Sequence, residues 1–560
     1  MKFNFLKKLV ALRTIFDSED KISFIKISFL LVISVFLEII ALSFIAPILS
    51  LLQGLESKVP ILDSFINLNE LSLVNLLFYS TSIIIIKNII QFYSNHYQNT
   101  IGFFHQRKLS NKVLNHYLNN SFVKNSQNNS SDVINNIIKV VNTVCQYMIL
   151  PLFYLISEIT LIASIFSYLI YFDFYTSILI GLFFGISLTI YNLIVGKKIA
   201  LLGKIVMVND SLKIKYITES IMSFVSIKLG KKQEYFLNKF NKPNEFVSKS
   251  LSLQFSLRQL PKYYFEILLY LFLLLLVLVS PEKGDSFLTK LGVFVAAMIK
   301  ILPSLNRVTG SIQSMKFSES ALNQLISFNL YENRVVSKKQ ILFKEGIYFE
   351  NVSFSYPEKS NVINNFSFSF QKNKIFGIIG DSGRGKTTLL NLLLGNLFAQ
   401  SGSVKIDEES LNERTASEWQ NKIGYLPQKI FLLDDTIIRN IAFGVEDINI
   451  DKKRINEVLK LSQLETLSNT LNIDVDLLGE NGNKLSGGQI QRIGLARSLY
   501  NNPSVLFFDE FTSALDDKVE KEILHDINKL KQNKTIFIIS HKKSIIEFCD
   551  EIINLNTDTL

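Results

Sequence analysis

The feature that most constrains this chain is a set of long apolar runs, of which Phe174–Gly196 contains no Asp, Glu, Lys or Arg. Crossing ~30 Å of hydrocarbon takes ~20 helical residues. Hydrocarbon offers no water to unpaired backbone groups, so such runs have to be helical. We therefore predict six membrane-spanning helices, at about 27–52, 71–95, 148–171, 174–196, 263–280 and 286–303.

The distribution of charge gives these helices a direction. Residues 1–340 hold 34 Lys and Arg against 19 Asp and Glu, whereas 341–560 hold 25 against 30. The basic excess lies in the apolar half, concentrated in the loops 98–142 and 196–260, and basic loops stay in the cytoplasm. We predict that both termini and these two loops are cytoplasmic. This pattern favours a membrane partner over nucleic acid.

The connecting segments carry two further predictions. The long inner loops favour spans that continue as polar helices beyond the membrane, and the Asn-rich stretch 126–132 is typical of a turn or helix cap at the tip of one loop. The outer loop 58–70 fits either a short amphipathic helix or a plain loop.

The first apolar run is too long for a cleavable signal. Two cysteines, Cys145 and Cys549, provide no disulfide framework.

The last 220 residues change to short β runs alternating with helices, which is typical of an α/β nucleotide-binding domain. We therefore expect a helical membrane domain at 1–325, a linker at 326–340 and an α/β P-loop NTPase domain at 341–560. The predicted fold class is an α-helical membrane domain of six helices fused to this α/β domain.

A phosphate-binding loop stands near the start of the second half. The apolar strand Lys374–Gly380 runs into GDSGRGKT and then into a helical run. Glycines let backbone N–H groups approach phosphates, and a helix N-terminus adds partial positive charge. Lys386 is expected to reach the β- and γ-phosphates, and Thr387 to bind Mg²⁺. The residues expected to contact nucleotide here are Gly380, Asp381, Ser382, Gly383, Arg384, Gly385, Lys386, Thr387 and Thr388.

A second apolar strand, Ser504–Glu510, ends in two acids. Asp509 is suited to the Mg²⁺ shell and Glu510 to a base that polarises an attacking water. Phosphoryl transfer depends mostly on positioning and charge neutralisation, so a P-loop with these acids predicts an ATPase.

The segment LSGGQ at 485–489 completes a pattern that resembles ATP-binding-cassette (ABC) transporters. The resemblance implies a role for each motif: Tyr356 stacks on adenine, Gln428 is the Q-loop glutamine that also reaches Mg²⁺, and His541 is the switch histidine. The signature residues that would contact ATP are Ser486, Gly487, Gly488 and Gln489. The D-loop corresponds to Ser513–Asp516.

Six spans ahead of one cassette resemble the exporter-type half-transporters of this family. That resemblance implies ATP and Mg²⁺ as cofactors, and a dimer in which each signature covers the ATP of the partner, with Lys386, Glu510 and His541 as catalytic residues. A homodimer would have two competent sites, although a heterodimer stays open. Gly479, Glu480 and Gly482 match a short exporter segment that senses the membrane loops. Phe511 departs from the usual small residue, and HKKS departs from the usual Arg after the histidine.

The substrate is predicted from charges within the spans, which are functional candidates because they are costly there. They are Glu38, Lys87, Glu158, Glu266, Lys290 and Lys300. Lys87 and Lys300, with Lys262 at a span entrance, lie toward the predicted cytoplasmic side and would suit an anionic head group. The alternative is that they reach lipid head groups.

The membrane half also resembles flippases of polyprenyl-pyrophosphate-linked oligosaccharides, in the segments EIIALSFIAPILSLL, FVSIKL, LPKYYFE and KILPSLNRV. That branch carries arginines where Lys87, Lys262 and Lys300 stand, and lysine loses the bidentate fork. We expect an ATP-driven exporter or flippase of a lipid-linked saccharide in a bacterial inner membrane. The alternatives are a lipid, multidrug or peptide exporter, and a regulatory ABC membrane protein that does not transport.

Overall fold

The computed structural model describes residues 20–52, 73–120, 122, 129–279, 285–328, 339–356, 362–381, 383–465, 472–512 and 515–556. The chain divides into two compact units: Met1–Asn120 with Asn125–Asn333, and Arg334–Leu560 with the short segment Ser121–Lys124. The predicted outer segment 58–70 and most of the predicted linker 326–340 lie outside the described residues.

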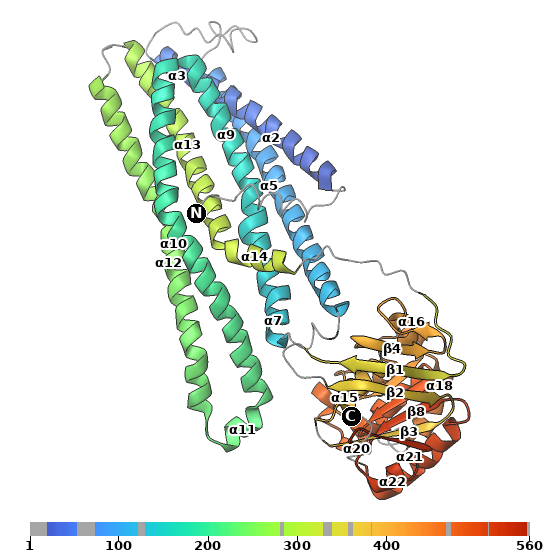
Figure 1. Ribbon diagram of the computed structural model, residues 1–560. Coiled ribbons are helices and arrows are strands. Elements are labelled where there is room, and N and C mark those ends of the chain that lie inside the picture. Colours follow the sequence, from blue (N-terminus) through green and yellow to red (C-terminus); the bar gives the residue numbers. More distant parts are fainter. Residues whose placement is uncertain are drawn as a thin grey trace. The chain divides into compact units, whose positions relative to one another are not determined.

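The described residues of the first unit are almost all helical (Figure 1). Two π-helical turns, Asn136–Val140 and Cys145–Ile149, join three of its α-helices end to end, so that 130–172 is one continuous helical segment. The helices are α2 (Asp20–Ser43), α3 (Ile45–Leu52), α5 (Leu73–Leu118), α7 (Ser130–Asn135), α8 (Val141–Val144), α9 (Leu150–Phe172), α10 (Phe174–Met222), α11 (Phe224–Leu229), α12 (Gln233–Val279), α13 (Asp285–Phe317) and α14 (Glu319–Ser327).

Five helical segments among the described residues are long and apolar enough to span a membrane. They are Ile25–Leu49, Leu73–Leu118, Ser130–Phe172, Phe174–Met222 and Leu291–Phe317. The remaining predicted span, 263–280, falls in the last part of α12 and is not among these five. The first predicted run is not one helix: α2 ends at Ser43 and α3 begins at Ile45, because Pro47 lacks the N–H that would bond to Ser43 and crowds its carbonyl.

Three helices are much longer than a bilayer requires. α5 has 46 residues, α10 has 49 and α12 has 47. At 1.5 Å per residue each is ~70 Å long, more than twice the ~30 Å hydrocarbon core. They continue into polar sequence, as expected for the inner loops. α10 and α12 run side by side and are joined at one end by the short helix α11 (Figure 1).

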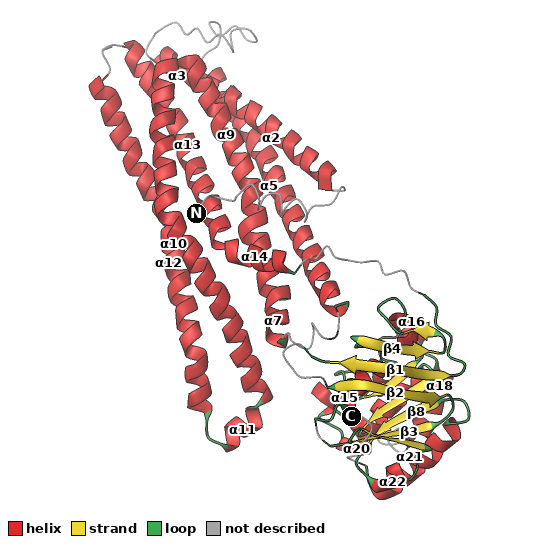
Figure 2. Cartoon of the chain, viewed as in Figure 1, coloured by secondary structure: helices red, strands yellow, loops and turns green. Residues whose placement is uncertain are grey.

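The second unit is an α/β domain with two sheets (Figure 2). An antiparallel sheet has the order β2-β1-β4-β5, and a parallel sheet has the order β6-β7-β8-β3-β9. The strands are β1 (Gly346–Phe354), β2 (Ile363–Gln371), β3 (Ile375–Ile379), β4 (Ser401–Ile406), β5 (Glu409–Ser410), β6 (Ile423–Leu426), β7 (Val505–Asp509), β8 (Thr535–Ile539) and β9 (Glu551–Asn554). Its helices are α15 (Lys386–Leu393), α16 (Ala416–Gln420), α17 (Ile437–Ile441), α18 (Lys452–Leu461), α20 (Gly487–Tyr500), α21 (Asp517–Leu530) and α22 (Lys543–Ile546).

Aromatic side chains fill the space between the two sheets. Phe537 stacks between Phe376 and Phe507, with ring centroids 5.3 and 4.7 Å away, and Phe370 of β2 packs edge-on against Phe376 and Phe537. These four rings are at most 1% exposed. This packing holds the central strands β3, β7 and β8 in place. The nucleotide motifs follow the carboxyl ends of β3, β7 and β8, which is the side where parallel sheets usually bind ligands.

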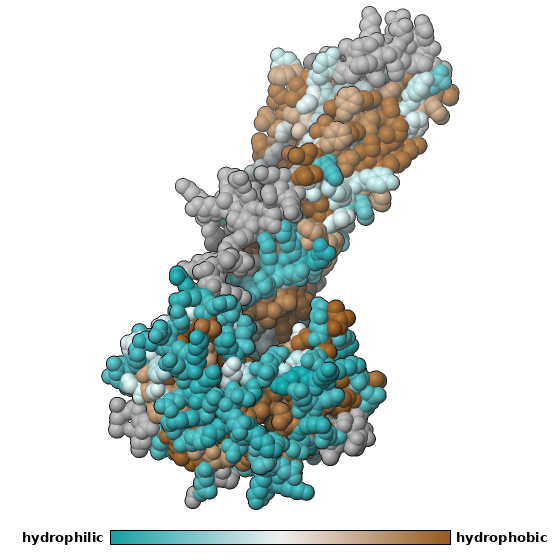
Figure 3. Space-filling model, turned by 90° about the vertical axis from the view of Figure 1, so that its right-hand side faces the viewer, coloured by the Kyte–Doolittle hydropathy of each residue, from teal (hydrophilic) through white to brown (hydrophobic). Residues whose placement is uncertain are grey.

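The surfaces of the two units differ in chemistry. Hydrophobic residues dominate the helical unit over its spanning segments, and hydrophilic residues dominate the α/β unit (Figure 3). Many large apolar side chains on α5, α10 and α12 are more than half exposed, such as Phe78, Ile194 and Leu278. Exposure on this scale is costly in water and favourable in lipid. The predicted fold class, a helical membrane domain with an α/β cassette, is confirmed.

Candidate functional site

The predicted phosphate loop connects β3 to the N-terminus of α15. Gly380, Gly383 and Gly385 have φ angles of 153°, 87° and 92°, a region that residues with a Cβ rarely adopt. A Cβ on Gly385 would also lie 3.2 Å from Val362. The loop therefore brings bare backbone to a helix N-terminus, which favours an anion. Ser382 lies outside the described residues.

Lys386 and the two threonines after it have different surroundings. Lys386 Nζ donates to the carbonyl oxygens of Gly380 at 2.5 Å and Asp381 at 3.1 Å, so the cation is held at the loop. Thr387 is exposed, whereas Thr388 is buried with its hydroxyl 3.5 Å from the hydroxyl of Tyr356. The aromatic residue predicted to stack on adenine therefore lies beside the phosphate-binding helix.

The two acids of the second motif occupy the end of β7. Glu510 has a left-handed φ of 50°, and its N–H donates to Ile539 of β8 at 3.0 Å. Phe511 is 3% exposed and packs against Phe508 with ring centroids 5.0 Å apart. The unusual phenylalanine is thus anchored in the core of its own cassette, where it fixes the turn that carries Glu510.

Glu510 is the meeting point of three predicted motifs. Gln428 Nε2 donates to Glu510 Oε2 at 2.5 Å, and His541 Nε2 lies 3.8 Å from Glu510 Oε1. Burial raises the pKa of Asp509, and the neighbouring carboxylate of Glu510 raises it further, while Lys386 opposes the shift. The fold thus gathers Lys386, Gln428, Asp509, Glu510 and His541 from four separate segments.

The donor set suits Mg²⁺ bound together with a nucleotide. Thr387, Gln428 and Asp509 offer hydroxyl, amide and carboxylate oxygens, the hard ligands that Mg²⁺ prefers. No cluster of three or more His, Cys, Asp or Glu able to hold a metal occurs among the described residues. Mg²⁺ usually takes one or two protein carboxylates and completes its shell with water and phosphate, so the residues present fit this ion.

The signature residues form a separate surface. Ser486 caps α20: its hydroxyl accepts from Gln489 N at 3.3 Å, and its own N–H donates to Gln489 Oε1 at 2.8 Å. This N-terminus opens onto a pocket of about 330 Å³. The pocket is lined by Ser486, Gly487, Gly488, Arg492, Leu515, Asp516 and Val519. The signature and the end of the D-loop therefore share one anion-attracting face.

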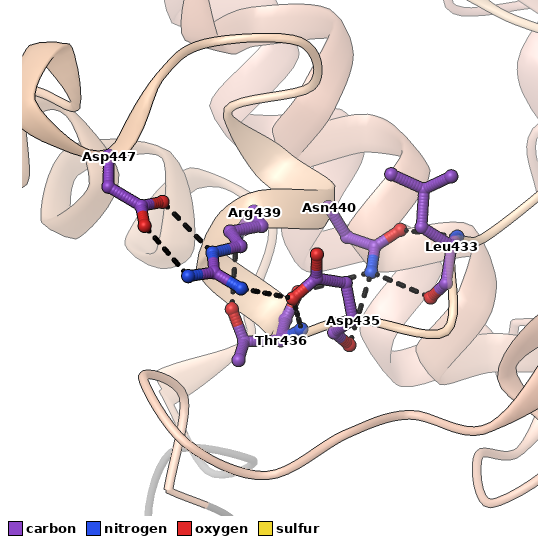
Figure 4. A network of polar contacts seen from close by, with 6 residues as sticks. All are labelled: Leu433, Asp435, Thr436, Arg439, Asn440 and Asp447. Carbon is purple, nitrogen blue, oxygen red and sulfur yellow. Dashed lines mark hydrogen bonds and ion pairs between the residues drawn. The ribbon is translucent and has the colours of Figure 1, made fainter. Parts of the chain in front are cut away.

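A polar network fixes the segment that follows Gln428 (Figure 4). Arg439 of α17 pairs with both carboxylate oxygens of Asp447, at 2.9 and 2.7 Å, and with Asp435 at 3.0 Å. Asn440 is fully buried and bonds to both backbone groups of Leu433. Arg497 of the signature helix α20 donates to the carbonyl of Asn440 at 2.8 Å. The segment after the Q-loop is thereby tied to the signature helix, a link that the motifs alone did not reveal.

A second unpredicted contact follows the switch histidine. Lys542 Nζ pairs with Glu520 of α21 at 2.5 Å and donates to the carbonyl of Thr512 at 3.1 Å. Glu520 is 4% exposed. Lys542 stands where the resembled exporters have arginine, and this difference was the only available sequence signal. The contacts of Lys542 connect the histidine loop to the segment just after Glu510.

Four of the six charges predicted within the spans form ion pairs: Glu38, Lys87, Glu158 and Lys300. Glu38 forms ion pairs with Lys87 and, at 3.5 Å, with Lys300. Glu158 holds Arg307 through two bonds of 2.5 and 3.0 Å. The structure thus brings together two of the three lysines predicted to bind substrate.

The other predicted charges have different surroundings. Lys262 and Glu266 are exposed on α12, with no ion pair among the described residues. The side chain of Lys290 lies outside those residues.

The fold and the motif geometry define a class: a membrane protein whose helical domain is fused to a P-loop nucleotide-binding cassette. Residues 363–513 match the ABC transporter family model. The whole chain has the fold of the structure of a bacterial Atm1-family ABC exporter with ATP bound, with a TM-score of 0.81, 18% identity, and coverage of 96% of this chain and 94% of that one. The chain therefore has the domain content and fold of an ABC exporter half-transporter.

Curated relatives match over shorter stretches. A putative export ATP-binding/permease protein of Rickettsia typhi is 38% identical over 211 residues, which cover 37% of this chain and 36% of that protein. An ATP-dependent lipid A-core flippase of Ralstonia nicotianae is 31% identical over 290 residues, 50% of this chain and 49% of that protein. This chain thus aligns with about half of these relatives' length or less.

Proposed function

We propose that this protein is an ATPase that drives export or flipping of an anionic lipid, with a lipid-linked saccharide as the favoured substrate. The observation that carries the proposal is the convergence of Lys386, Gln428, Asp509, Glu510 and His541. These residues supply a phosphate-binding cation, a metal-binding carboxylate and a base. Regulatory proteins that only bind nucleotide have no need of an intact base.

The hydrolytic role of each residue follows from its chemistry. The P-loop backbone and Lys386 would bind the phosphates, and Tyr356 would stack on the base. Mg²⁺ held by Thr387, Gln428 and Asp509 would neutralise charge on the β- and γ-phosphates. Glu510 would accept a proton from the attacking water.

His541, close to Glu510, would orient the terminal phosphate. The rest of the nucleotide set, Gly380, Asp381, Ser382, Gly383, Arg384, Gly385 and Thr388, is proposed to surround the triphosphate.

Two copies of the chain are proposed to act together. The signature pocket presents Ser486, Gly487, Gly488 and Asp516 around a helix N-terminus, and none of the described P-loop residues lines it. A triphosphate held by one cassette would fill this pocket on the other, which makes the dimer nucleotide-dependent. Hydrolysis would remove that stabilisation and let the two cassettes separate.

The cassette and both termini are proposed to lie in the cytoplasm of a bacterial cell.

The lipid class is supported by charge in the helical unit and by relatives named as lipid A-core flippases. Lys300 and Arg307 lie seven residues apart on α13, ~10 Å along the helix, with side chains 40% and 53% exposed. Two partly exposed cations at this spacing suit a phosphate-bearing head group. The exposed Lys262 is a third candidate contact.

The proposal is tested by reconstituting the full chain in liposomes that contain a fluorescent polyprenyl-pyrophosphate saccharide or a fluorescent glycerophospholipid. ATP with Mg²⁺ should make the label accessible on the opposite leaflet, and ADP should not. Faster ATP-dependent movement of the saccharide lipid would support the favoured substrate. ATP hydrolysis without movement of either lipid would contradict lipid export.

A further inference from the structure

Glu38 is the most enclosed charge described in the helical unit. It lies on α2 and is 1% exposed, and its carboxylate meets the ammonium groups of Lys87 from α5 and Lys300 from α13. A buried carboxylate is stable as an anion only when cations or donors compensate it. One carboxylate here faces two cations, so the cluster carries a net charge of +1.

The two lysines are not equivalent partners. The Lys87 side chain is 11% exposed and lies on a polar seam between α2 and α5. Ser34, one turn from Glu38, donates to Gln91, one turn from Lys87, at 2.7 Å. This antiparallel register holds the Glu38–Lys87 pair between two packed helices. Lys87 is therefore the fixed counter-ion of Glu38.

Lys300 is the partner that can be exchanged. Its ammonium is 3.5 Å from Glu38 Oε1, and its side chain is 40% exposed. An ammonium that faces hydrocarbon is costly, so the exposed side of Lys300 has to meet water or an anion. An anion that binds Lys300 competes with Glu38, and Glu38 stays neutralised by Lys87 when it loses that competition.

We propose that Glu38 is a specificity-determining residue that competes with the substrate: a lipid phosphate displaces its carboxylate from Lys300, while Lys87 keeps Glu38 paired. This rests on the proposed function, because it assigns the head-group site of the same transporter. Only a head group with a net negative charge compensates for the lost ion pair, because the cation of a zwitterionic head group offsets the charge of its phosphate. Glu38 thus lowers the affinity for neutral and zwitterionic lipids, because these lipids would have to bind without displacing the Glu38 carboxylate from Lys300.

The test measures binding rather than transport. Purified full-length protein in phosphatidylcholine nanodiscs is labelled with a photo-activatable phosphatidic acid, without nucleotide. The double variant Glu38→Gln/Lys87→Met removes one charge of each sign, so the net charge stays at +1 and Lys300 is released. Its half-saturating lipid concentration should fall by at least ~3-fold, and that of Lys300→Gln should rise by at least ~3-fold. Glu266→Gln, an exposed acid on α12, raises the net charge without releasing a lysine and should leave the value unchanged.

Equal half-saturation in the wild type and the double variant would overturn the proposal. If the double variant does not fold, Glu38→Asp shortens the reach to Lys300 and should also increase binding. Parallel measurement of ATP-driven lipid movement separates the two claims. A shift in binding without movement supports the head-group site and contradicts transport, whereas movement without a shift contradicts the role of Glu38.

Discussion

The side-chain amide of Gln428 donates a 2.5 Å hydrogen bond to the carboxylate of Glu510. The Q-loop and the proposed catalytic base are thus in direct contact within one cassette. The bond occupies one of the two oxygens of Glu510, and His541 approaches the other at 3.8 Å. The base is therefore held between the Q-loop glutamine and the switch histidine that the resemblance predicts.

Removing the negative charge of Glu510 should stop hydrolysis without preventing ATP binding. General-base catalysis contributes roughly 10²–10⁴-fold, so Glu510→Gln should lower kcat by about that factor. The affinity for ATP should stay within a few-fold of the wild type, because no proposed phosphate contact is lost. Steady-state hydrolysis and equilibrium binding of a fluorescent ATP analogue measure the two quantities. Hydrolysis at the wild-type rate would remove Glu510 from its role.

The ionised carboxylate of Asp509 should lower the free energy of unfolding of the cassette at neutral pH, relative to a neutral side chain of the same size. Burial and the adjacent Glu510 raise its pKa, so the folded protein binds this proton more tightly than the unfolded chain does. The stabilisation from that proton is complete below the ordinary carboxyl pKa and is lost as pH rises through the raised value. Asp509→Asn should therefore increase the Tm at pH 7 while it abolishes Mg²⁺-dependent hydrolysis. A Tm below that of the wild type would contradict this account of the charge.

Lys542 should act as a positioning residue for His541. Its ion pair with buried Glu520 and its bond to Thr512 tie the histidine loop to the segment after Glu510. Lys542→Ala should lower kcat several-fold with little change in KM for ATP, and Lys542→Arg, which keeps the charge, should restore it. Lys518→Ala, on the same helix as Glu520, is the matched control. A loss of Tm with unchanged kcat per folded molecule would indicate a purely structural role.

The signature should act on the nucleotide of the partner. Lys386→Ala impairs one chain's P-loop, and Ser486→Arg would fill the signature pocket of the other. Each variant alone should be inactive. Mixed dimers of the two would keep one intact P-loop opposite one intact signature and should regain part of the hydrolysis. Dimers joined in a single polypeptide would give the same readout with fixed stoichiometry, and no recovery in them would contradict the trans arrangement.

The sequence was sufficient for those features that depend on local pattern. Apolar length predicts a spanning helix, and a Gly-rich loop between a strand and a helix predicts a phosphate site, because both are decided within about 25 residues. The sequence did not reveal the break at Phe44, where the effect of Pro47 was hidden inside a continuous apolar run.

Contacts between distant segments were out of reach of the sequence. Glu38, Lys87 and Lys300 were each recognised as costly charges in a membrane. Their pairing depends on the packing of three helices, which periodicity alone does not determine. The contact of Lys542 with Glu520 and the bond from Arg497 to Asn440 are of the same kind.

The central claim is that ATP hydrolysis by this chain moves an anionic lipid across a bilayer. The most direct test is leaflet exchange of a fluorescent anionic lipid in proteoliposomes, comparing the wild type with Glu510→Gln at equal protein density. We predict movement that requires ATP and Mg²⁺ in the wild type and is absent in the variant. Equal movement in both proteins, or active hydrolysis with no movement of any anionic lipid, would contradict the account.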